Sequence, residues 1–428
     1  MSAGTPAAPP MGMPWHAWLA VVALCIALPG CTLSRPDYLA PDIAVGESAF
    51  VRAVEAHTLS GLIEGNRAEV LLNGDEIFPA MLAAIRGART TITFANFSWE
   101  DGAVAREMVQ ALAARCRAGV GVNILVDAIG SSAMPKALGR TLAASGCHFA
   151  RYKPVRPLTI KRVNHRNHRR VLVVDGRIGF TGGTGIGEKW TGDGRGAGHW
   201  RQTDVRVEGP IVRALQAAFV EDWREATTLL LGGDAYFPVL ERRGDLAIQS
   251  VKSSPASGAT EAYLLFLLAI ESARTSIKIT NPYFVPDARM ARALAEAARR
   301  GVDVTLITAG AVSGTQNQIV RKASQAHFGR VLEAGVKIHE YGPAMLHAKT
   351  MVVDDQWVSI GSANLDNASF ALNNELNVTF LDRRLARRLS EIFANDLQST
   401  TPVTLEEWRR HVFRHLLYLP LIPLRDQL

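Results

Sequence analysis

The hydrophobic and polar positions of this chain predict helices and strands that alternate along the sequence. In the first half, helices are expected near residues 78–88 and 103–117, and strands near 90–97 and 120–126. Gly119 falls between the second helix and its strand, where a glycine suits a helix C-terminus. Alternation of this kind predicts an α/β fold, with a mixed or parallel sheet flanked by helices.

The second half repeats this order of elements. Asp287 is a residue that can cap the start of a helix, and Gly301 can end it. The apolar run at 302–308 then predicts a strand. The same pattern of elements is therefore expected twice in one chain.

Short stretches of sequence recur in both halves as well. Residues 84–92 read AIRGARTTI and residues 269–277 read AIESARTSI, while FVEDW at 219–223 is matched by FANDL at 393–397. Because the matches keep their order, the sequence indicates an ancient duplication. The expected organisation is a leader or anchor at 1–31, a first half at 68–225, a linker at 226–259, a second half at 260–400 and an apolar tail at 401–428.

The first residues read as a targeting or anchoring segment. Residues 15–29 are almost all apolar, a length that suits the core of a signal peptide better than a membrane-spanning helix. The LPGC sequence ending at Cys31 resembles a bacterial lipoprotein cleavage box, in which Cys31 would carry the lipid. The alternatives are an uncleaved membrane anchor and a start codon assigned too early. The tail could form a helix with one apolar face, able to lie in a bilayer interface or to cap the core.

Composition narrows the class of protein and of partner. With 48% hydrophobic and 20% charged residues, the chain is globular, and its net charge of +7 favours anionic partners such as nucleic acid, anionic lipid or a phosphate-bearing substrate. Cys116 and Cys147 belong to no CxxC pair or Cys/His cluster, so no metal site is expected. The sequence leaves a disulfide between these two cysteines open.

The clearest chemical signal lies in the second half. A histidine and a lysine two residues apart on a strand point to the same face, as Met351 would two residues further on. Such a pair can serve one phosphate, with imidazole as nucleophile or acid and ammonium on the non-bridging oxygens. The carboxylate of Glu375, later in the sequence, is expected to orient the imidazole of His347. The motif comprises His347, Lys349, Asp354, Gly361, Ser362, Asn364 and Glu375.

The first half carries a weaker copy of this motif. His168, Arg170 and Asp175 are followed by Gly183 and Gly185 at the same spacing. Arginine replaces the lysine of the second copy, which keeps the positive charge, and Gly185 replaces the asparagine. No glutamate falls at the position of the second copy's carboxylate, although a glutamine, Gln202, lies near it.

The two motifs resemble the signature HxKx4Dx6GSxN of the phospholipase D superfamily, which usually occurs twice per chain. Within that superfamily, HWR at 199–201 and NPYF at 281–284 are similar to sequences of bacterial cardiolipin synthases, as is LDNASF at 365–370. The resemblance implies two duplicated halves, each a mixed sheet flanked by helices, packed about a pseudo-two-fold axis. It also implies that His168 and His347 meet at one phosphate.

This resemblance implies a reaction without metal or cofactor. One histidine attacks phosphorus and forms a phosphohistidine, and the other protonates the leaving alcohol and later deprotonates the acceptor. The more complete motif favours His347 as the nucleophile. The catalytic residues implied are His168, His347, Lys349, Asp354, Arg170 and Asp175, and the substrate-binding residues are Ser362, Asn364, Glu375 and Gly183.

The resemblance implies a membrane-associated phosphatidyltransferase that makes cardiolipin from phosphatidylglycerol or another phosphatidyl donor. Alternatives are a phospholipase D that transfers to water, a nuclease of the same superfamily and a lipid-binding protein with a decayed site. The apolar N-terminal run and tail favour a membrane surface and a phospholipid substrate over nucleic acid. No obligate protein partner is expected. The expected location is the cell membrane of a bacterium, or a lipoprotein that faces the periplasm.

Overall fold

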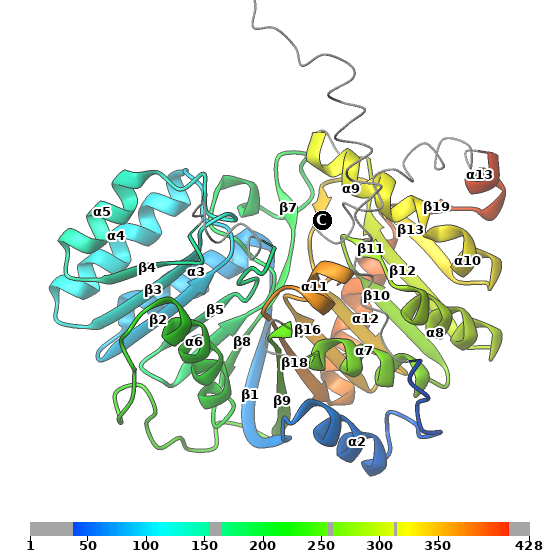
Figure 1. Ribbon diagram of the computed structural model, residues 1–428, viewed down its shortest axis with the longest axis horizontal. Helices are drawn as coiled ribbons and strands as arrows, with labels where there is room; N and C mark the ends of the chain where they lie inside the picture. The colour runs from blue at the N-terminus through cyan, green and yellow to red at the C-terminus, as the bar shows by residue number, and fades with distance from the viewer. Residues whose placement is uncertain (1–36, 155–163, 256–259, 312–314, 411–428) are drawn as a thin grey trace, which may run out of the picture.

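A single mixed sheet runs through the whole molecule (Figure 1). The structure is a computed structural model, and it describes residues 37–154, 164–255, 260–311 and 315–410. The sheet has 15 strands. In spatial order these are β19 (Thr400–Val403), β13 (Lys337–Tyr341), β12 (Asp303–Ala309), β10 (Ser276–Thr280), β15 (Thr350–Val353), β16 (Trp357–Gly361), β18 (Glu375–Leu381), β9 (Leu246–Ser253), β1 (Ile63–Leu72), β8 (Thr203–Glu208), β6 (Ile178–Thr181), β5 (Val171–Val174), β2 (Thr91–Asn96), β3 (Gly121–Asp127) and β4 (His148–Tyr152).

The two halves of the sheet meet where β9 pairs antiparallel with β1. Outward from this seam, β18, β16, β15, β10, β12 and β13 have the same order as β8, β6, β5, β2, β3 and β4. This order confirms the α/β fold and the two matched halves about a pseudo-two-fold axis. The segment 226–259, which was expected to be a linker, contributes the seam strand β9.

Helices cover both faces of the sheet in each half. On one face lie α3 (Asn73–Gly87), α4 (Ala103–Arg117) and α5 (Lys136–Ala144) in the first half, and α7 (Glu261–Glu271), α8 (Ala288–Arg299) and α10 (Phe328–Glu333) in the second. On the other lie α6 (Val212–Ala226) and α12 (Arg383–Leu397). The remaining elements are α2 (Ser48–Thr58), η2 (Glu188–Trp190), α9 (Thr315–Ala326), α11 (Asn367–Ala371), α13 (Leu405–Arg410), β7 (Trp200–Arg201), β11 (Phe284–Val285), β14 (Met345–Leu346) and β17 (Leu365–Asp366).

The core follows the period of two along each strand. In β5, Leu172 and Val174 pack with α3 and α4, whereas Val171 and Val173 pack with α6. Both faces of this strand are therefore buried, which explains why its sequence is an unbroken apolar run. One cluster holds side chains of both α6 and α12, so the core continues across the seam between the halves.

The expected helix boundaries are largely confirmed. Helix α4 has the expected bounds, and α8 begins where Asp287 Oδ1 accepts a hydrogen bond from Met290 N at 2.8 Å. Gly301 follows the end of α8 with a φ of 93°, a conformation that favours glycine. Helix α3 begins at residue 73 instead of near 78, because the Glu76 carboxylate accepts a hydrogen bond from Leu72 N at 2.8 Å and fixes an earlier start.

The described parts of the two ends pack on the second half. Phe50 and Val54 of α2 belong to the core cluster around α7 and α8. At the other end, Trp408 Nε1 donates to the Gln325 carbonyl at 2.7 Å, so the start of the tail caps the core. Cys31 and the rest of the tail lie outside the described residues. None of the described helices combines the length and the apolar character that crossing a membrane requires.

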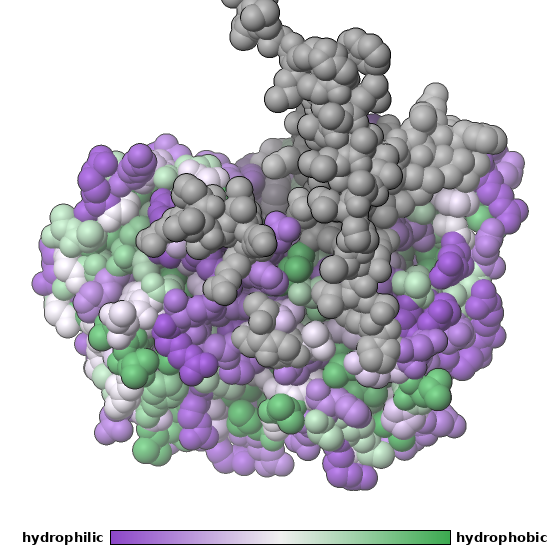
Figure 2. Space-filling model, in the orientation of Figure 1, coloured by the Kyte–Doolittle hydropathy of each residue, from purple (hydrophilic) through white to green (hydrophobic). Residues whose placement is uncertain are grey.

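The surface seen in Figure 2 mixes polar and apolar residues over both halves, and no broad apolar area stands out among the described residues of this face.

A disulfide joins Cys116 near the end of α4 to Cys147 before β4, with Cα atoms 5.5 Å apart. The sequence alone did not decide whether these two cysteines form a disulfide, and the structure contains this bond.

Arg169 forms hydrogen bonds with residues of both halves of the molecule. Its side chain is fully buried, and its three nitrogens donate hydrogen bonds to residues of both halves. Two of these bonds reach the carboxylates of Asp222 at 3.1 Å and Glu221 at 3.0 Å. The remaining acceptors are the carbonyls of Ala218, Ser253 and Glu375 and the hydroxyl of Ser254.

We expect Arg169→Met to lower the free energy of unfolding by about 3–5 kcal/mol, because it leaves buried acceptors and a buried carboxylate without their partner. Denaturant unfolding followed by circular dichroism measures this change. The matched control is Arg86→Met, because the Arg86–Glu107 pair is a surface pair with both side chains about half exposed, which contributes about 1 kcal/mol or less. Equal effects of the two substitutions would contradict this role of Arg169.

Candidate active site

The two motif histidines lie in extended stretches just before strands β5 and β15. His168 is 6% exposed and His347 is 5% exposed. Strand β15 begins at Thr350, so His347 and Lys349 lie just before it, and Met351 lies within it. The backbone of each histidine bonds to the opposite half instead, with His168 N to Asn374 O at 3.0 Å and His347 N to Arg201 O at 2.9 Å.

Each imidazole is also held by a side chain from the other half. His168 Nδ1 lies 2.8 Å from Glu375 Oε1. The amide nitrogen of Gln202 contacts His347 Nδ1. The expectation that Glu375 orients the imidazole of its own motif is therefore wrong, because the halves exchange these partners across the pseudo-two-fold axis.

A pair of aspartates at matched positions anchors these exchanged partners. Asp222 on α6 accepts a hydrogen bond from Asn374 Nδ2 at 2.8 Å, and Asn374 immediately precedes Glu375. Asp396 on α12 accepts from Arg201 Nε at 3.0 Å, and Arg201 immediately precedes the glutamine that holds His347. In each half, an aspartate from the repeated FVEDW or FANDL stretch thus fixes the partner of its own half's histidine.

Two buried cations stand beside the histidines. Arg170 and Lys349 are 4% and 2% exposed, and each donates a hydrogen bond to the carbonyl of the histidine two residues before it. Within the described ranges, neither has a carboxylate in ion-pair contact. Desolvation lowers the pKa of Arg170 to about 10, and desolvation together with the charge of Arg170 lowers the pKa of Lys349 well below its ordinary value. Buried charge without a direct counter-ion suits an anionic ligand.

Burial keeps both imidazoles neutral near pH 7. Desolvation, helped by the charge of Arg170, lowers the pKa of His168 to about 4, although the carboxylate of Glu375 acts in the opposite direction. The pKa of His347 is also lowered well below its ordinary value, by desolvation and then by the charges of Lys349 and Arg170. A neutral imidazole can act as a nucleophile or donate its single N–H proton.

The residues expected to bind substrate divide into two groups. Ser362 Oγ donates to Glu375 Oε2, so both of these side chains serve His168 instead of facing a ligand. Gly183 donates its N–H to Asp204 Oδ1 at 2.9 Å and accepts from Gln202 through its carbonyl. The polar atoms of all three residues are bonded within the protein, so substrate binding by these residues stays a prediction. Asn364 remains a candidate, since its buried Oδ1 has no partner within the described residues.

The two motif aspartates, Asp175 and Asp354, follow strands β5 and β15, whereas the motif histidines precede these strands. Asp175 accepts hydrogen bonds from the backbone N–H groups of residues 89–91, and Asp354 accepts from those of residues 274–276. A strand of four residues separates each aspartate from the site by more than about 10 Å. This placement corrects the expectation that they are catalytic, since each carboxylate fixes the entry to a neighbouring strand.

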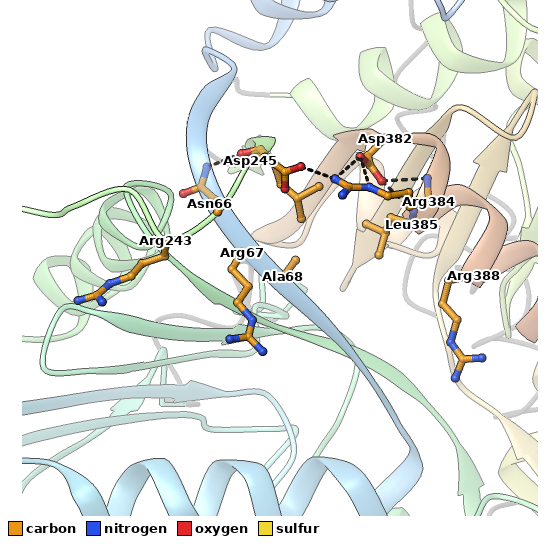
Figure 3. A pocket seen from close by; sticks show the side chains of 11 residues that line it. Asn66, Arg67, Ala68, Arg243, Asp245, Asp382, Arg384, Leu385 and Arg388 are labelled. Atoms are coloured by element: carbon orange, nitrogen blue, oxygen red, sulfur yellow. Dashed lines mark hydrogen bonds and ion pairs between the residues drawn. The ribbon is translucent and has the colours of Figure 1, made fainter.

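A groove with a volume of about 440 Å³ lies elsewhere on the seam (Figure 3). Its lining includes Asn66 and Arg67 near the start of β1, and an ion pair between Arg384 and Asp245 at 2.7 Å crosses it. The opposite end of β1 reaches the site, where Leu72 pairs with the strand that follows Gln202. The groove is therefore separate from the histidines. In the described part of the chain no three His, Cys, Asp or Glu residues lie close enough to hold a metal ion.

Sequence reasoning missed the exchange of partners and the anchoring aspartates. Gln202 was noted only as a residue near the position matching Glu375. The repeated stretches that contain Asp222 and Asp396 were visible as a duplication, but their contacts join segments about 150 residues or more apart in the chain. A search for polar residues shared by both repeats would have singled out this pair of aspartates.

Comparison with known proteins agrees with this geometry. The family described as "Cardiolipin synthase, PLD-like domain" matches residues 81–223 and 266–397. Cardiolipin synthase A of Pseudomonas putida (strain GB-1) is 34% identical over 365 residues, which is 84% of this chain and 74% of the relative. Cardiolipin synthase of Staphylococcus aureus (strain Mu50 / ATCC 700699) is 33% identical over 346 residues, 80% of this chain and 69% of the relative.

The fold is shared with a solved enzyme of low sequence identity. Phosphatidylserine synthase of Haemophilus influenzae Rd KW20 superimposes with a TM-score of 0.68 at 14% identity, covering 88% of this chain and 99% of its own. This likeness concerns the fold alone. Together, the duplicated sheet, the two buried histidines and the matches over both halves show that the chain belongs to the cardiolipin synthase family of phospholipase D-like proteins.

Proposed function

We propose that this protein is a phosphatidyltransferase that makes cardiolipin from phosphatidylglycerol at a membrane surface. The observation that carries the proposal is the site itself, in which two neutral imidazoles lie beside two buried cations that have no direct counter-ion among the described residues. A phosphodiester supplies the negative charge that such a site lacks. The names of the relatives at 33–34% identity support cardiolipin as the product.

His168 is the proposed nucleophile, in place of His347, which the sequence had favoured. With Glu375 accepting a hydrogen bond from Nδ1, the lone pair of His168 lies on Nε2. The same carboxylate stabilises the positive charge that develops when this nitrogen bonds to phosphorus, as the aspartate does for the histidine of a catalytic triad. His347 has no such carboxylate, because its partner Gln202 is uncharged.

His347 is the proposed acid and base. The amide nitrogen of Gln202 lies between the carbonyl of Gly183 and His347 Nδ1, and the carbonyl can only accept a hydrogen bond. The amide therefore donates to Nδ1 as well, and the proton of the neutral imidazole lies on Nε2. A histidine in this form can give its proton to a leaving oxygen.

The reaction then proceeds in two steps. Nε2 of His168 bonds to phosphorus as the bond from phosphorus to the glycerol headgroup breaks, and His347 protonates that oxygen so that glycerol leaves. A hydroxyl of a second phosphatidylglycerol then gives its proton to His347 and attacks phosphorus. The phosphohistidine bond breaks, and cardiolipin and the free imidazole are formed. Arg170 and Lys349 offset the charge on the transferring phosphoryl group in both steps.

Incubation of the purified protein with vesicles of labelled phosphatidylglycerol tests this proposal. Cardiolipin and glycerol in equal amounts are the expected products. Phosphatidic acid would instead indicate a phospholipase D that transfers to water, and no product at any lipid composition would contradict both activities. His168→Ala serves as the control for contaminating enzymes.

Arg170 is expected to act as the counterpart of Lys349, since both donate to the carbonyl of their own histidine. We expect Arg170→Lys to keep kcat/KM within about tenfold of the wild type, because lysine can form the same bond. Arg170→Ala removes a buried positive charge and should cost about 2–4 kcal/mol of transition-state stabilisation. Rates on the same lipid vesicles decide the matter. If both variants match the wild type, the arginine has no part in the reaction.

Activity is expected to survive a chelator such as EDTA. The histidines supply the nucleophile and the acid, and Arg170 and Lys349 supply the positive charge, so none of these tasks requires a metal ion. The measurement is cardiolipin formation before and after dialysis against EDTA. Loss of activity that a divalent cation restores would contradict this expectation.

We further propose that the catalytic part faces an oxidising compartment, as a periplasm-facing protein held at the membrane by its N-terminal segment. The Cys116–Cys147 disulfide supports this placement, because disulfides persist outside the reducing cytoplasm. Peptide mass spectrometry after lysis of cells in a thiol-blocking reagent tests it. Disulfide-linked Cys116 and Cys147 are expected, and blocked free thiols at both positions would contradict it. The same digest shows whether Cys31 carries a lipid.

A further inference from the structure

The loop that lacks the motif asparagine is filled by a tryptophan. A Cβ added at Gly185 would lie 2.6 Å from two carbons of the Trp190 indole and 2.9 Å from Cε2, the carbon bonded to the indole nitrogen. Such distances are shorter than van der Waals contact, so no side chain fits at residue 185 while the indole is present. In the second half, the same motif position holds Asn364.

The indole stands close to His347. Trp190 is 2% exposed, and its ring centroid lies 6.5 Å from that of His347 and 4.9 Å from that of Trp200, which itself lies 4.9 Å from His347. The turn that carries Trp190 is held in place by Glu188, whose carboxylate accepts from Val104 N at 3.1 Å. The indole therefore has a fixed place beside the histidine that we propose as the acid.

Its nitrogen is a buried donor without a partner. Trp190 Nε1 forms no hydrogen bond within the described part of the chain, although it is shielded from solvent. The indole N–H can only donate a hydrogen bond, and leaving a buried donor unpaired costs about 1–3 kcal/mol. A ligand oxygen within hydrogen-bond distance of Nε1 would remove this cost.

We propose that Trp190 takes the place of the missing asparagine and donates its indole N–H to an oxygen of the bound phosphodiester. This inference rests on the proposed function in that it needs a phosphodiester in the site. It assigns to the first half a phosphate donor in place of the side chain that its motif lacks at Gly185. The two halves then contact the phosphoryl group through different side chains, an indole from the first half and the Asn364 amide from the second.

The experiment compares Trp190→Phe with Trp223→Phe. Both substitutions keep an aromatic ring and remove a buried indole N–H that has no partner among the described residues, but Trp223 stacks on Phe219 in the core, away from the site. Two quantities are measured, kcat and KM on phosphatidylglycerol and the affinity for orthovanadate, a mimic of the transferring phosphoryl group. We expect Trp190→Phe to lower kcat about 10- to 100-fold, to change KM less and to weaken vanadate binding, whereas Trp223→Phe changes none of these.

The two measurements separate the inference from the proposed function. If the wild type makes no cardiolipin but binds vanadate, and Trp190→Phe weakens that binding, the function is wrong and the role of Trp190 stands. If Trp190→Phe matches Trp223→Phe in both measurements, the inference is wrong. A wild type that neither makes cardiolipin nor binds vanadate overturns both.

A second pair of variants guards against misfolding of Trp190→Phe. Gly185→Asn alone should lose activity and stability, because its side chain would overlap the indole. Adding Trp190→Gly to Gly185→Asn opens the space for the amide. The kcat of this double variant should then be at least about tenfold higher than that of Gly185→Asn alone. Full activity of Gly185→Asn alone, or no recovery in a double variant that folds as judged by circular dichroism, would contradict the shared position.

Discussion

Replacing either His168 or His347 with alanine is expected to abolish turnover, but only replacing His168 is expected to abolish the covalent phosphoenzyme on a substrate whose leaving group needs no proton. The loss in kcat should be about 10⁴-fold or more for each, because a nucleophile and its acid act as one unit. The difference between them appears with a phosphatidyl ester of p-nitrophenol, whose leaving group needs no proton. On this substrate, His347→Ala should release one equivalent of p-nitrophenol and retain labelled phosphohistidine.

The outcome distinguishes three arrangements of the site. Phosphohistidine in His168→Ala but not in His347→Ala would reverse the roles assigned from Glu375 and Gln202. A His168→Ala variant with near wild-type turnover would mean that the first half is only a scaffold. Peptide mapping of the labelled residue under alkaline conditions identifies the histidine directly, and matching circular dichroism spectra show that the variants remain folded.

The fold could be predicted because its signals are local and occur twice. The bounds of α4 and the cap of α8 by Asp287 follow from short-range propensities, and the repeated stretches indicated two halves. The family resemblance then supplied the pseudo-two-fold arrangement. The strand β9 was missed because its segment also contains glycine, serine and proline runs typical of a linker.

The contacts of the site could be predicted only in part, because the two motifs are completed across the seam. Spacing places Glu375 after its own motif, but the antiparallel pairing of β9 with β1 brings it to His168. Spacing also puts Asp175 seven residues after His168, yet the intervening strand carries its carboxylate away from the site. Sequence patterns thus identified most of the chemical groups, while the sheet determines which of them meet.

Glu375→Gln is expected to reduce kcat about 10²- to 10⁴-fold with little change in KM. The amide is uncharged, so it no longer stabilises the positive phosphohistidine, and it can hold the imidazole in the wrong tautomer. The pH dependence has a definite sign. The carboxylate favours the protonated imidazole and so raises the pKa of His168, which burial has lowered to about 4. Its removal lowers that pKa further and moves the acid limb of kcat/KM to lower pH.

Two control variants separate this effect from a loss of packing. Glu340→Gln makes the same change at a buried carboxylate that pairs with Arg321 away from the histidines, and it should leave the pH profile unchanged. Gln202→Glu in the Glu375→Gln background moves the carboxylate from one imidazole to the other, since Gln202 holds His347 as Glu375 holds His168. If the carboxylate decides which histidine is the nucleophile, this double variant should regain part of the lost rate and carry its phosphohistidine on His347. If its label stays on His168, another difference between the two motifs assigns the roles, such as Arg170 in place of Lys349 or Gly185 in place of Asn364.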